Sequence, residues 1–195
     1  RRGFVVGTAS TGLMIGILGA CSQTDSKQEL TPNPEVNAWV HIGNDDTVTI
    51  RIARSEMGQG TLTGLAQLVA DELDCDWNKV VTEYPTPGEN LKRARVWGDY
   101  STGGSRGIRA SQQYVREGGA AAKAMLLEAA AQKWGVPITE CSAKDSVITH
   151  SPSGKTITYG KVADAAAKLP PPLEIKVKDP SDRRTNEFPL RWVFN

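Results

Sequence analysis

The sequence predicts an α+β fold in which antiparallel hairpins pack against two long helices. Apolar and polar residues alternate over 47–52, next to turn-forming residues at 43–46, which is typical of a β-hairpin with one solvent-exposed face. Two other segments, 62–73 and 106–134, carry apolar residues at helical spacing. Strands and helices are mixed without a regular βαβ rhythm, so we expect an antiparallel sheet.

Local signals support the individual elements. In the first helix, Leu62, Leu65 and Val69 fall on one face, and in the second, Gly135 and Pro137 follow the last turn as a stop signal. The other expected elements are, in chain order, a short strand at 79–85, a long irregular loop at 85–104, a hairpin at 146–160 that turns at SPSG, and a last helix at 159–169 before the prolines at 170–172.

Composition excludes several classes of function. The chain has 195 residues, with 23 basic and 22 acidic side chains, so its net charge of +1 gives no basis for binding nucleic acid through bulk charge. The three cysteines, Cys21, Cys75 and Cys141, and the two histidines, His41 and His150, have no metal-ligand spacing, so no metal site is predicted. We interpret Cys75 as a buried structural thiol.

The N-terminal segment has the pattern of an export signal. Residues 1–21 begin with an arginine pair, continue with an apolar stretch and end in LGAC, which indicates a twin-arginine-type signal with a lipobox. Cys21 is then the expected lipidation site, and residues 22–36 a polar linker. A plain signal cleaved near Ala20 and an uncleaved anchor remain alternatives. We therefore expect an exported, periplasmic chain, held at the membrane by its signal or a lipid.

A first glycine-rich loop, SEMGQG at 55–60, lies between a predicted strand and a predicted helix. The start of a helix has unpaired N–H groups and partial positive charge, so glycines there let an anionic group approach the backbone. Gly58 and Gly60 fit this requirement. The amide of Gln59, between them, has both a donor and an acceptor and is suited to the edge of a flat heterocycle.

A second glycine-rich stretch, at 99–111, precedes the other long helix. Gly103, Gly104 and Ser105 can form another anion-binding backbone loop, and Arg106 and Arg109 add forked donors for phosphate oxygens. Two such loops in one small domain indicate one extended ligand with several charges. The alternative is that both are ordinary turns with helix caps.

Two common nucleotide-binding motifs do not fit the first loop. The glycines at 58, 60 and 64 give GxGxxxG rather than the dinucleotide-binding pattern, with Thr63 in place of the third glycine, although Glu83 lies at a suitable distance for its acid. The preceding strand also alternates, unlike a buried parallel strand. No GK[ST] sequence is present for a P-loop. These differences argue against an NAD-dependent dehydrogenase.

Several motifs in combination resemble the molybdopterin-binding subunits of the xanthine oxidase family. They are the two glycine-rich loops together with NAWVHIGNDDTVTI, LVADELDCDWNKV, AQKWGV and VKDP, within residues 35–180. The resemblance is to the large subunits of isoquinoline 1-oxidoreductase-like and aldehyde dehydrogenase-like enzymes. It implies that residues 37–180 form part of a molybdenum-cofactor-binding domain.

The resemblance also implies a cofactor and its contacts. The cofactor is molybdopterin cytosine dinucleotide carrying molybdenum, with Gln59 bound to the pterin and Gly58 and Gly60 beside it. The residues implied to contact cofactor phosphate and pterin from the second loop are Thr102, Gly103, Gly104, Ser105 and Arg106.

The reaction implied by the resemblance is hydroxylation of an aldehyde or N-heterocycle carbon with oxygen from water. Electrons then leave through a small iron–sulfur subunit. The glutamate base of the family lies in a GxGE-type motif that this sequence lacks, so no catalytic residue is predicted here, and Glu56 is expected to support the cofactor loop. Residues 181–195 depart from the family pattern, and we interpret the chain as a truncated or frame-shifted product, inactive alone. The alternative is a non-catalytic exported lipoprotein or interaction domain that keeps only the fold.

Overall fold

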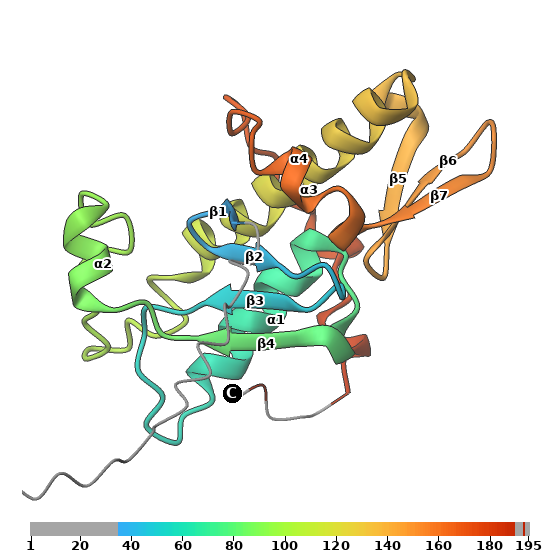
Figure 1. Ribbon diagram of the computed structural model, residues 1–195. Helices are drawn as coiled ribbons and strands as arrows, with labels where there is room; N and C mark the ends of the chain where they lie inside the picture. Colours follow the sequence, from blue (N-terminus) through green and yellow to red (C-terminus); the bar gives the residue numbers. More distant parts are fainter. Residues whose placement is uncertain (1–34, 190–192, 194–195) are drawn as a thin grey trace, which may run out of the picture. The chain divides into compact units, whose positions relative to one another are not determined.

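The computed structural model describes residues 35–189 and 193 (Figure 1). The predicted signal and the lipidation site Cys21 lie outside the described residues. The chain divides into two compact units, 1–31 and 32–195, and all that follows concerns the second. No helix among the described residues is long and apolar enough to cross a membrane.

The main sheet has four strands in the order β1-β2-β3-β4. The strands are β1 (Glu35–Asn37), β2 (Val40–Ile42), β3 (Val48–Arg51) and β4 (Val80–Glu83). The first three are antiparallel, which confirms the predicted hairpin. β1 includes the last two residues of the predicted linker.

One pair in this sheet is parallel, which the sequence analysis did not predict. β4 pairs in parallel with β3, with Val48 opposite Val80 and Arg51 opposite Glu83. Helix α1 (Thr61–Leu73) makes the crossover between them. A single βαβ unit within an otherwise antiparallel sheet gives no repeated rhythm, and β3 alternates in sequence, so the local pattern does not reveal it.

The expectation that the hairpin has a solvent-exposed face is wrong for β3, because Thr49 and Arg51 are buried. The guanidinium of Arg51 lies 5.2 Å from the ring centre of Trp97 and donates to Glu83 over 2.7 Å. Residues distant in sequence therefore cover the polar face of this strand, and they satisfy its charge.

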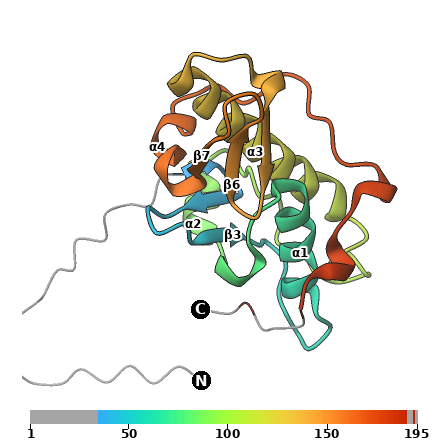
Figure 2. The same ribbon diagram turned by 90° about the vertical axis from the view of Figure 1, so that its right-hand side faces the viewer.

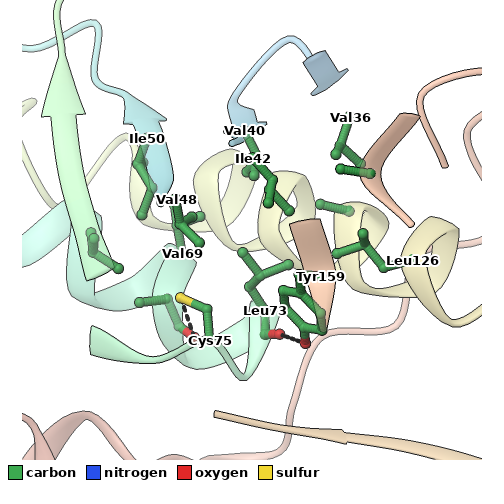
Figure 3. Close-up of a cluster of buried hydrophobic side chains, with 14 of the residues drawn as sticks. Val36, Val40, Ile42, Val48, Ile50, Val69, Leu73, Cys75, Leu126 and Tyr159 are labelled. Atoms are coloured by element: carbon green, nitrogen blue, oxygen red, sulfur yellow. Dashed lines mark hydrogen bonds between the residues drawn. The ribbon is translucent and has the colours of Figure 1, made fainter. Parts of the chain in front are cut away.

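Helices α1 and α3 (Gln112–Trp134) pack together on one face of the sheet (Figures 1 and 2). The crossing is close: a Cβ added at Gly119 would lie 2.7 Å from the carbonyl oxygen of Val69. The two helices bury their apolar faces against the strands (Figure 3) in one core, which includes Val40, Ile42, Val48, Ile50, Val69, Leu73, Leu126 and Tyr159.

The region between β4 and α3 differs from the prediction at both ends. The short helix α2 (Pro87–Lys92) lies in the predicted irregular loop, where Thr86 and Glu89 form a capping box and Pro87 takes the first helical turn. The predicted long helix starts at Gln112 rather than at 106. Residues 106–111 lie in turns instead, and the carbonyl of Ile108 accepts from the N–H groups of Ser111 and Gln112.

A second, three-stranded sheet follows α3. It consists of β5 (Cys141–Lys144), β6 (Val147–His150) and β7 (Lys155–Thr158), all antiparallel, which confirms the second predicted hairpin and adds one strand. The predicted last helix is the single turn α4 (Ala163–Ala166), preceded by a 3-10 turn. The 3-10 turns of the described chain are Trp77–Lys79, Ile138–Glu140, Tyr159–Lys161, Pro180–Asp182 and Thr185–Glu187.

The segment after residue 170 packs against α1 and β4. Arg184 donates its backbone N–H to Asp71 over 2.7 Å, and the Phe188 ring stacks on Trp77 with 5.2 Å between centres. The carbonyl of Val193 accepts hydrogen bonds from the N–H and the hydroxyl of Thr82. The described part of the predicted atypical tail is therefore docked on the domain.

A buried ion pair links both helices to this segment. Glu72 of α1, 1% exposed, accepts a 2.7 Å hydrogen bond from Nε of Arg116 on α3. Its other oxygen accepts from the backbone N–H of Lys178, whose carbonyl accepts from Arg116. Each charge in the cluster has a hydrogen-bonded partner, as burial requires.

Candidate cofactor site

The two glycine-rich loops lie at the same end of the main sheet (Figure 1) because they follow the carboxyl ends of β3 and β4, which are parallel neighbours. The first loop leaves β3 and leads into α1, and the second follows β4 and α2 and leads into α3. Between them is a pocket of about 500 Å³. It is lined by Met57, Gln59, Thr61, Thr102, Gly103, Gly104, Ser105, Gly107, Ile108 and Arg109.

Five of the eight residues predicted from sequence line this pocket: Gln59, Thr102, Gly103, Gly104 and Ser105. Gly58 and Gly60 flank Gln59 but do not line the pocket. Arg106 points to Asp99, with 3.0 Å between Nη1 and Oδ2. The structure thus brings the two predicted loops together, while the cofactor-binding role of each residue stays a prediction.

In the first loop, Glu56 binds the backbone around Gln59. Its Oε1 accepts hydrogen bonds from the N–H groups of Gly58 (2.7 Å) and Gly60 (2.9 Å), and its Oε2 accepts from Leu62 (3.0 Å). Burial opposes ionisation, but the N–H groups of Leu62, Gly60 and Gly58 together lower the pKa of the Glu56 carboxyl below its usual value of 4.5. These N–H groups are therefore already bonded to an anion within the chain.

The Gln59 side chain is also held by its own loop. Its Oε1 accepts from the N–H of Met57 over 2.5 Å, and its Nε2 donates to the carbonyl of Ser55 over 2.9 Å. An amide oxygen has two lone pairs and an amide nitrogen two hydrogens, so one acceptor and one donor position of Gln59 are left. The exposed amide is oriented and can still bind the edge of a planar ring.

The second loop offers unbonded donors. Among the residues that the structure describes, none accepts a hydrogen bond from the backbone N–H of Gly103, Gly104 or Ser105. Nearby, the exposed Arg109 guanidinium makes one hydrogen bond, of 3.2 Å, to the carbonyl of Gly104. Backbone donors in a left-handed turn beside an arginine are a suitable arrangement for phosphate oxygens.

Sequence reasoning missed Arg54, the residue that organises the second loop. This buried arginine extends from the end of β3 and donates to the Ser111 hydroxyl (2.9 Å), the Asp99 carboxylate (3.1 Å) and the carbonyl of Ser101. It therefore fixes both ends of the 99–111 segment. Its position immediately before SEMGQG could have drawn attention to it. The sequence alone could not identify its partners, because they lie far along the chain.

Two glycines let the loops pack closely. A Cβ at Gly107 would lie 2.6 Å from Oγ1 of Thr61, the first residue of α1, and a Cβ at Gly64 would lie 3.1 Å from the Ile108 side chain. A Cβ added at Gly58 or Gly60 would have no atom within 4 Å, so space does not require glycine at these positions. Their positive φ angles, 94° and 76°, do require it.

A larger pocket of about 640 Å³ is lined mainly by apolar groups, including Trp39, Trp97 and Tyr114, and contains none of the predicted residues. Within the described ranges there is no cluster of three metal-ligating side chains. Cys75 is buried, and burial raises the pKa of its thiol far above the usual value, which agrees with a structural role.

Comparison with known proteins identifies the family. Residues 2–189 match the family model described as molybdopterin cofactor-binding domain. The chain is 31% identical over 176 residues to isoquinoline 1-oxidoreductase subunit beta of Brevundimonas diminuta, with 87% of this chain and 22% of that protein covered. It is also 31% identical over 167 residues to the membrane-bound aldehyde dehydrogenase [pyrroloquinoline-quinone] of Gluconacetobacter polyoxogenes, with 83% of this chain and 21% of that protein covered.

Solved structures support the same fold. A Cu,Mo-CO dehydrogenase matches 74% of this chain and 18% of its own, at 21% identity and a TM-score of 0.50, and a reconstituted CO dehydrogenase from Oligotropha carboxidovorans matches with the same values. The chain spans about a fifth of the length of the curated relatives. It belongs to the molybdopterin cofactor-binding domain family, among the molybdopterin-binding subunits of the xanthine oxidase family.

Proposed function

We propose that the pocket between the two loops binds the pterin and phosphate groups of molybdopterin cytosine dinucleotide. The observation that carries the proposal is the shared pocket, where an oriented amide, Gln59, faces a loop with unbonded backbone N–H groups. A pterin edge requires paired donors and acceptors, and phosphate requires backbone N–H groups and a cation. One pocket offers both.

Each residue then has a definite role. Gln59 binds the pterin edge with its remaining donor and acceptor. The N–H groups of Gly103, Gly104 and Ser105, with the Ser105 hydroxyl, bind phosphate oxygens, and Arg109 supplies positive charge.

Other residues hold the two loops in place. Thr102 joins the loops, since its Oγ1 accepts from the N–H of Ser55. Arg106 acts through its ion pair with Asp99, which is itself bound to Arg54.

The bound cofactor supplies oxygen transfer to the substrate carbon, with water as the oxygen source, and the residues of this chain bind and orient it. We propose that the domain works within a longer large subunit that oxidises an aldehyde or an N-heterocycle and passes electrons to a small iron–sulfur subunit. In the same proposal the chain is exported to the periplasm and anchored at the membrane through its signal or through lipidated Cys21.

The test uses the full-length subunit expressed with cofactor biosynthesis active. Molybdenum is measured by mass spectrometry of the metal, and cytidine monophosphate is measured after acid release. We expect both in the wild-type subunit, and much less of both in Gln59→Ala at an unchanged melting temperature. Gln113→Ala, an exposed glutamine on α3, is the control. A folded wild-type subunit without molybdenum or cytidine nucleotide would overturn the proposal and favour a domain that keeps only the fold.

A further inference from the structure

The start of α1 is capped in an unusual way. Gly60 at the N-cap position has no side chain to accept a hydrogen bond, and the first turn contains no acidic residue. The carboxylate of Glu56, four residues before the cap, instead accepts from Gly58, Gly60 and Leu62. A full negative charge thus lies where a helix start favours an anion.

The two loops differ sharply in their free donors. The N–H groups of Gly58 and Gly60 are bonded to Glu56, whereas those of Gly103, Gly104 and Ser105 have no acceptor among the described residues. A phosphate arriving at the first loop would meet a carboxylate already on those donors and would be repelled by it. At the second loop it would meet open donors and Arg109.

The same carboxylate fixes the backbone on both sides of Gln59. Gly58 and Gly60 immediately flank this residue, and both donate to the same oxygen of Glu56. This anchoring sets where the Gln59 side chain leaves the backbone and keeps the carbonyl of Ser55 within 2.9 Å of Nε2. The orientation of the amide therefore depends on Glu56.

We infer that Glu56 is a positioning residue that occupies the anion-binding backbone of the first loop, orients Gln59 for the pterin, and leaves the cofactor phosphates to the second loop. The occupation of the first loop stands on the contacts of this chain alone. The assignment of pterin and phosphate to separate loops rests on the proposed function.

The first experiment follows backbone amides by NMR in the 195-residue chain, from about pH 7 to about pH 3. The amide signals of Gly58, Gly60 and Leu62 are expected to shift together with one midpoint below 4.5, the direction set by the lowered pKa of Glu56. Tyr84 also contacts this loop, because its hydroxyl accepts a hydrogen bond from the Glu56 N–H.

Two variants make this titration specific. Glu56→Gln, which keeps the side-chain volume, is expected to abolish the common shift, whereas Glu89→Gln, in the capping box of α2, is expected to leave it unchanged. Persistence of the common midpoint in Glu56→Gln, or three unrelated midpoints in the wild type, would overturn the inference.

The second experiment adds inorganic phosphate or cytidine monophosphate to the labelled chain. In the wild type we expect shifts at Gly103, Gly104 and Ser105 and none at Gly58 and Gly60. In Glu56→Ala we expect Gly58 and Gly60 to respond to phosphate, and acetate to restore their wild-type signals by replacing the lost carboxylate. Shifts at Gly58 and Gly60 in the wild type as large as those at the second loop would overturn the inference.

The full-length subunit separates this inference from the proposed function. Glu56→Gln is expected to lower molybdenum content about as far as Gln59→Ala does, because both act on the same amide. Normal loading of Glu56→Gln beside a poorly loaded Gln59→Ala would overturn the positioning role and leave the proposed function intact. A wild-type subunit without cofactor would overturn the proposed function, while the common titration of the three amides would still support occupation of the first loop by Glu56.

Discussion

The backbone N–H of Ser55 donates a 2.9 Å hydrogen bond to Oγ1 of Thr102, which joins the two glycine-rich loops directly. The two residues are 47 positions apart in the sequence. They meet because β3 and β4 are parallel neighbours, so the segments that follow them leave the sheet at the same edge. The candidate site is thus a product of topology as much as of its motifs.

Arg54 is expected to determine the order of the second loop. In Arg54→Lys one ammonium replaces the forked guanidinium and cannot reach Asp99, Ser101 and Ser111 together. Because hydrogen bonds to charged groups contribute more than neutral ones, we expect the free energy of unfolding to fall by about 1–3 kcal/mol. Urea denaturation measures the loss, and hydrogen exchange of residues 99–111 should accelerate.

Arg95→Lys is the control for Arg54, since Arg95 is exposed and close to the same loop. Its unfolding free energy should stay within about 0.5 kcal/mol of the wild type. Equal losses in the two variants would contradict the organising role of Arg54.

Gly107 is expected to tolerate no side chain. Its substitution by alanine would bring a Cβ within 2.6 Å of Oγ1 of Thr61, which is itself buried. Overpacking of this kind costs about 1–3 kcal/mol, and thermal unfolding should show a corresponding fall in melting temperature. Gly103→Ala, with open space around the added Cβ, should change it little. If Gly107→Ala is destabilising, adding Thr61→Ala should recover part of the loss.

The pair of Glu72 and Arg116 should be among the most sensitive sites in the core. Arg116→Met leaves a buried carboxylate without its cation, and we expect about 3–5 kcal/mol of lost stability in chemical denaturation. The double variant Glu72→Met with Arg116→Met removes both charges and should be less destabilised than Arg116→Met alone. If the double variant loses as much unfolding free energy as the two single variants together, the two side chains are not coupled.

Glu35 should make stability depend on pH. Burial opposes its ionisation, but the Arg93 hydrogen bonds and the charges of Arg51 and His41 outweigh it and lower the pKa of the Glu35 carboxyl below 4.5. A lowered native pKa gives stability that is complete above the unfolded value and is lost as pH falls through the native value. The urea midpoints of wild type and Glu35→Gln should therefore differ at neutral pH and converge in acid.

The control for Glu35 is Glu174→Gln, which removes an exposed carboxylate with no ion pair among the described residues. Its midpoint should follow the wild type at every pH. A difference between wild type and Glu35→Gln that grows on acidification would contradict the predicted sign.

Local patterns were sufficient for the hairpins and for α1, because alternation and helical spacing report directly on which face is buried. They failed where tertiary contacts decide. Arg51 and Thr49 looked exposed, yet Trp97 and neighbouring acids cover that face. The start of α3 was placed too early because the pattern continues through 106–111, where the chain makes turns and Arg54 binds the Ser111 hydroxyl.

In the candidate site too, local sequence patterns predicted some features, and tertiary contacts determined the others. The sequence identified both loops, since glycine beside a helix start is a local signal. It led us to expect that Glu56 supports the first loop, but it could not show which N–H groups the carboxylate binds, because these contacts depend on the backbone geometry at Gly58 and Gly60. It also could not assign Arg54 to residues 99–111, which come near only once β4 has paired with β3.

The parallel pairing of β3 and β4 has an evolutionary implication. The connection from Arg51 to Thr61 is brief and fixed at both ends, whereas the one from Glu83 to Gln112 holds α2 and several turns. Insertions in the longer connection can widen one wall of the pocket without shifting the other. A change of length between β4 and α3 would therefore alter the wall of the pocket formed by the second loop, while Gln59 keeps its position in the first.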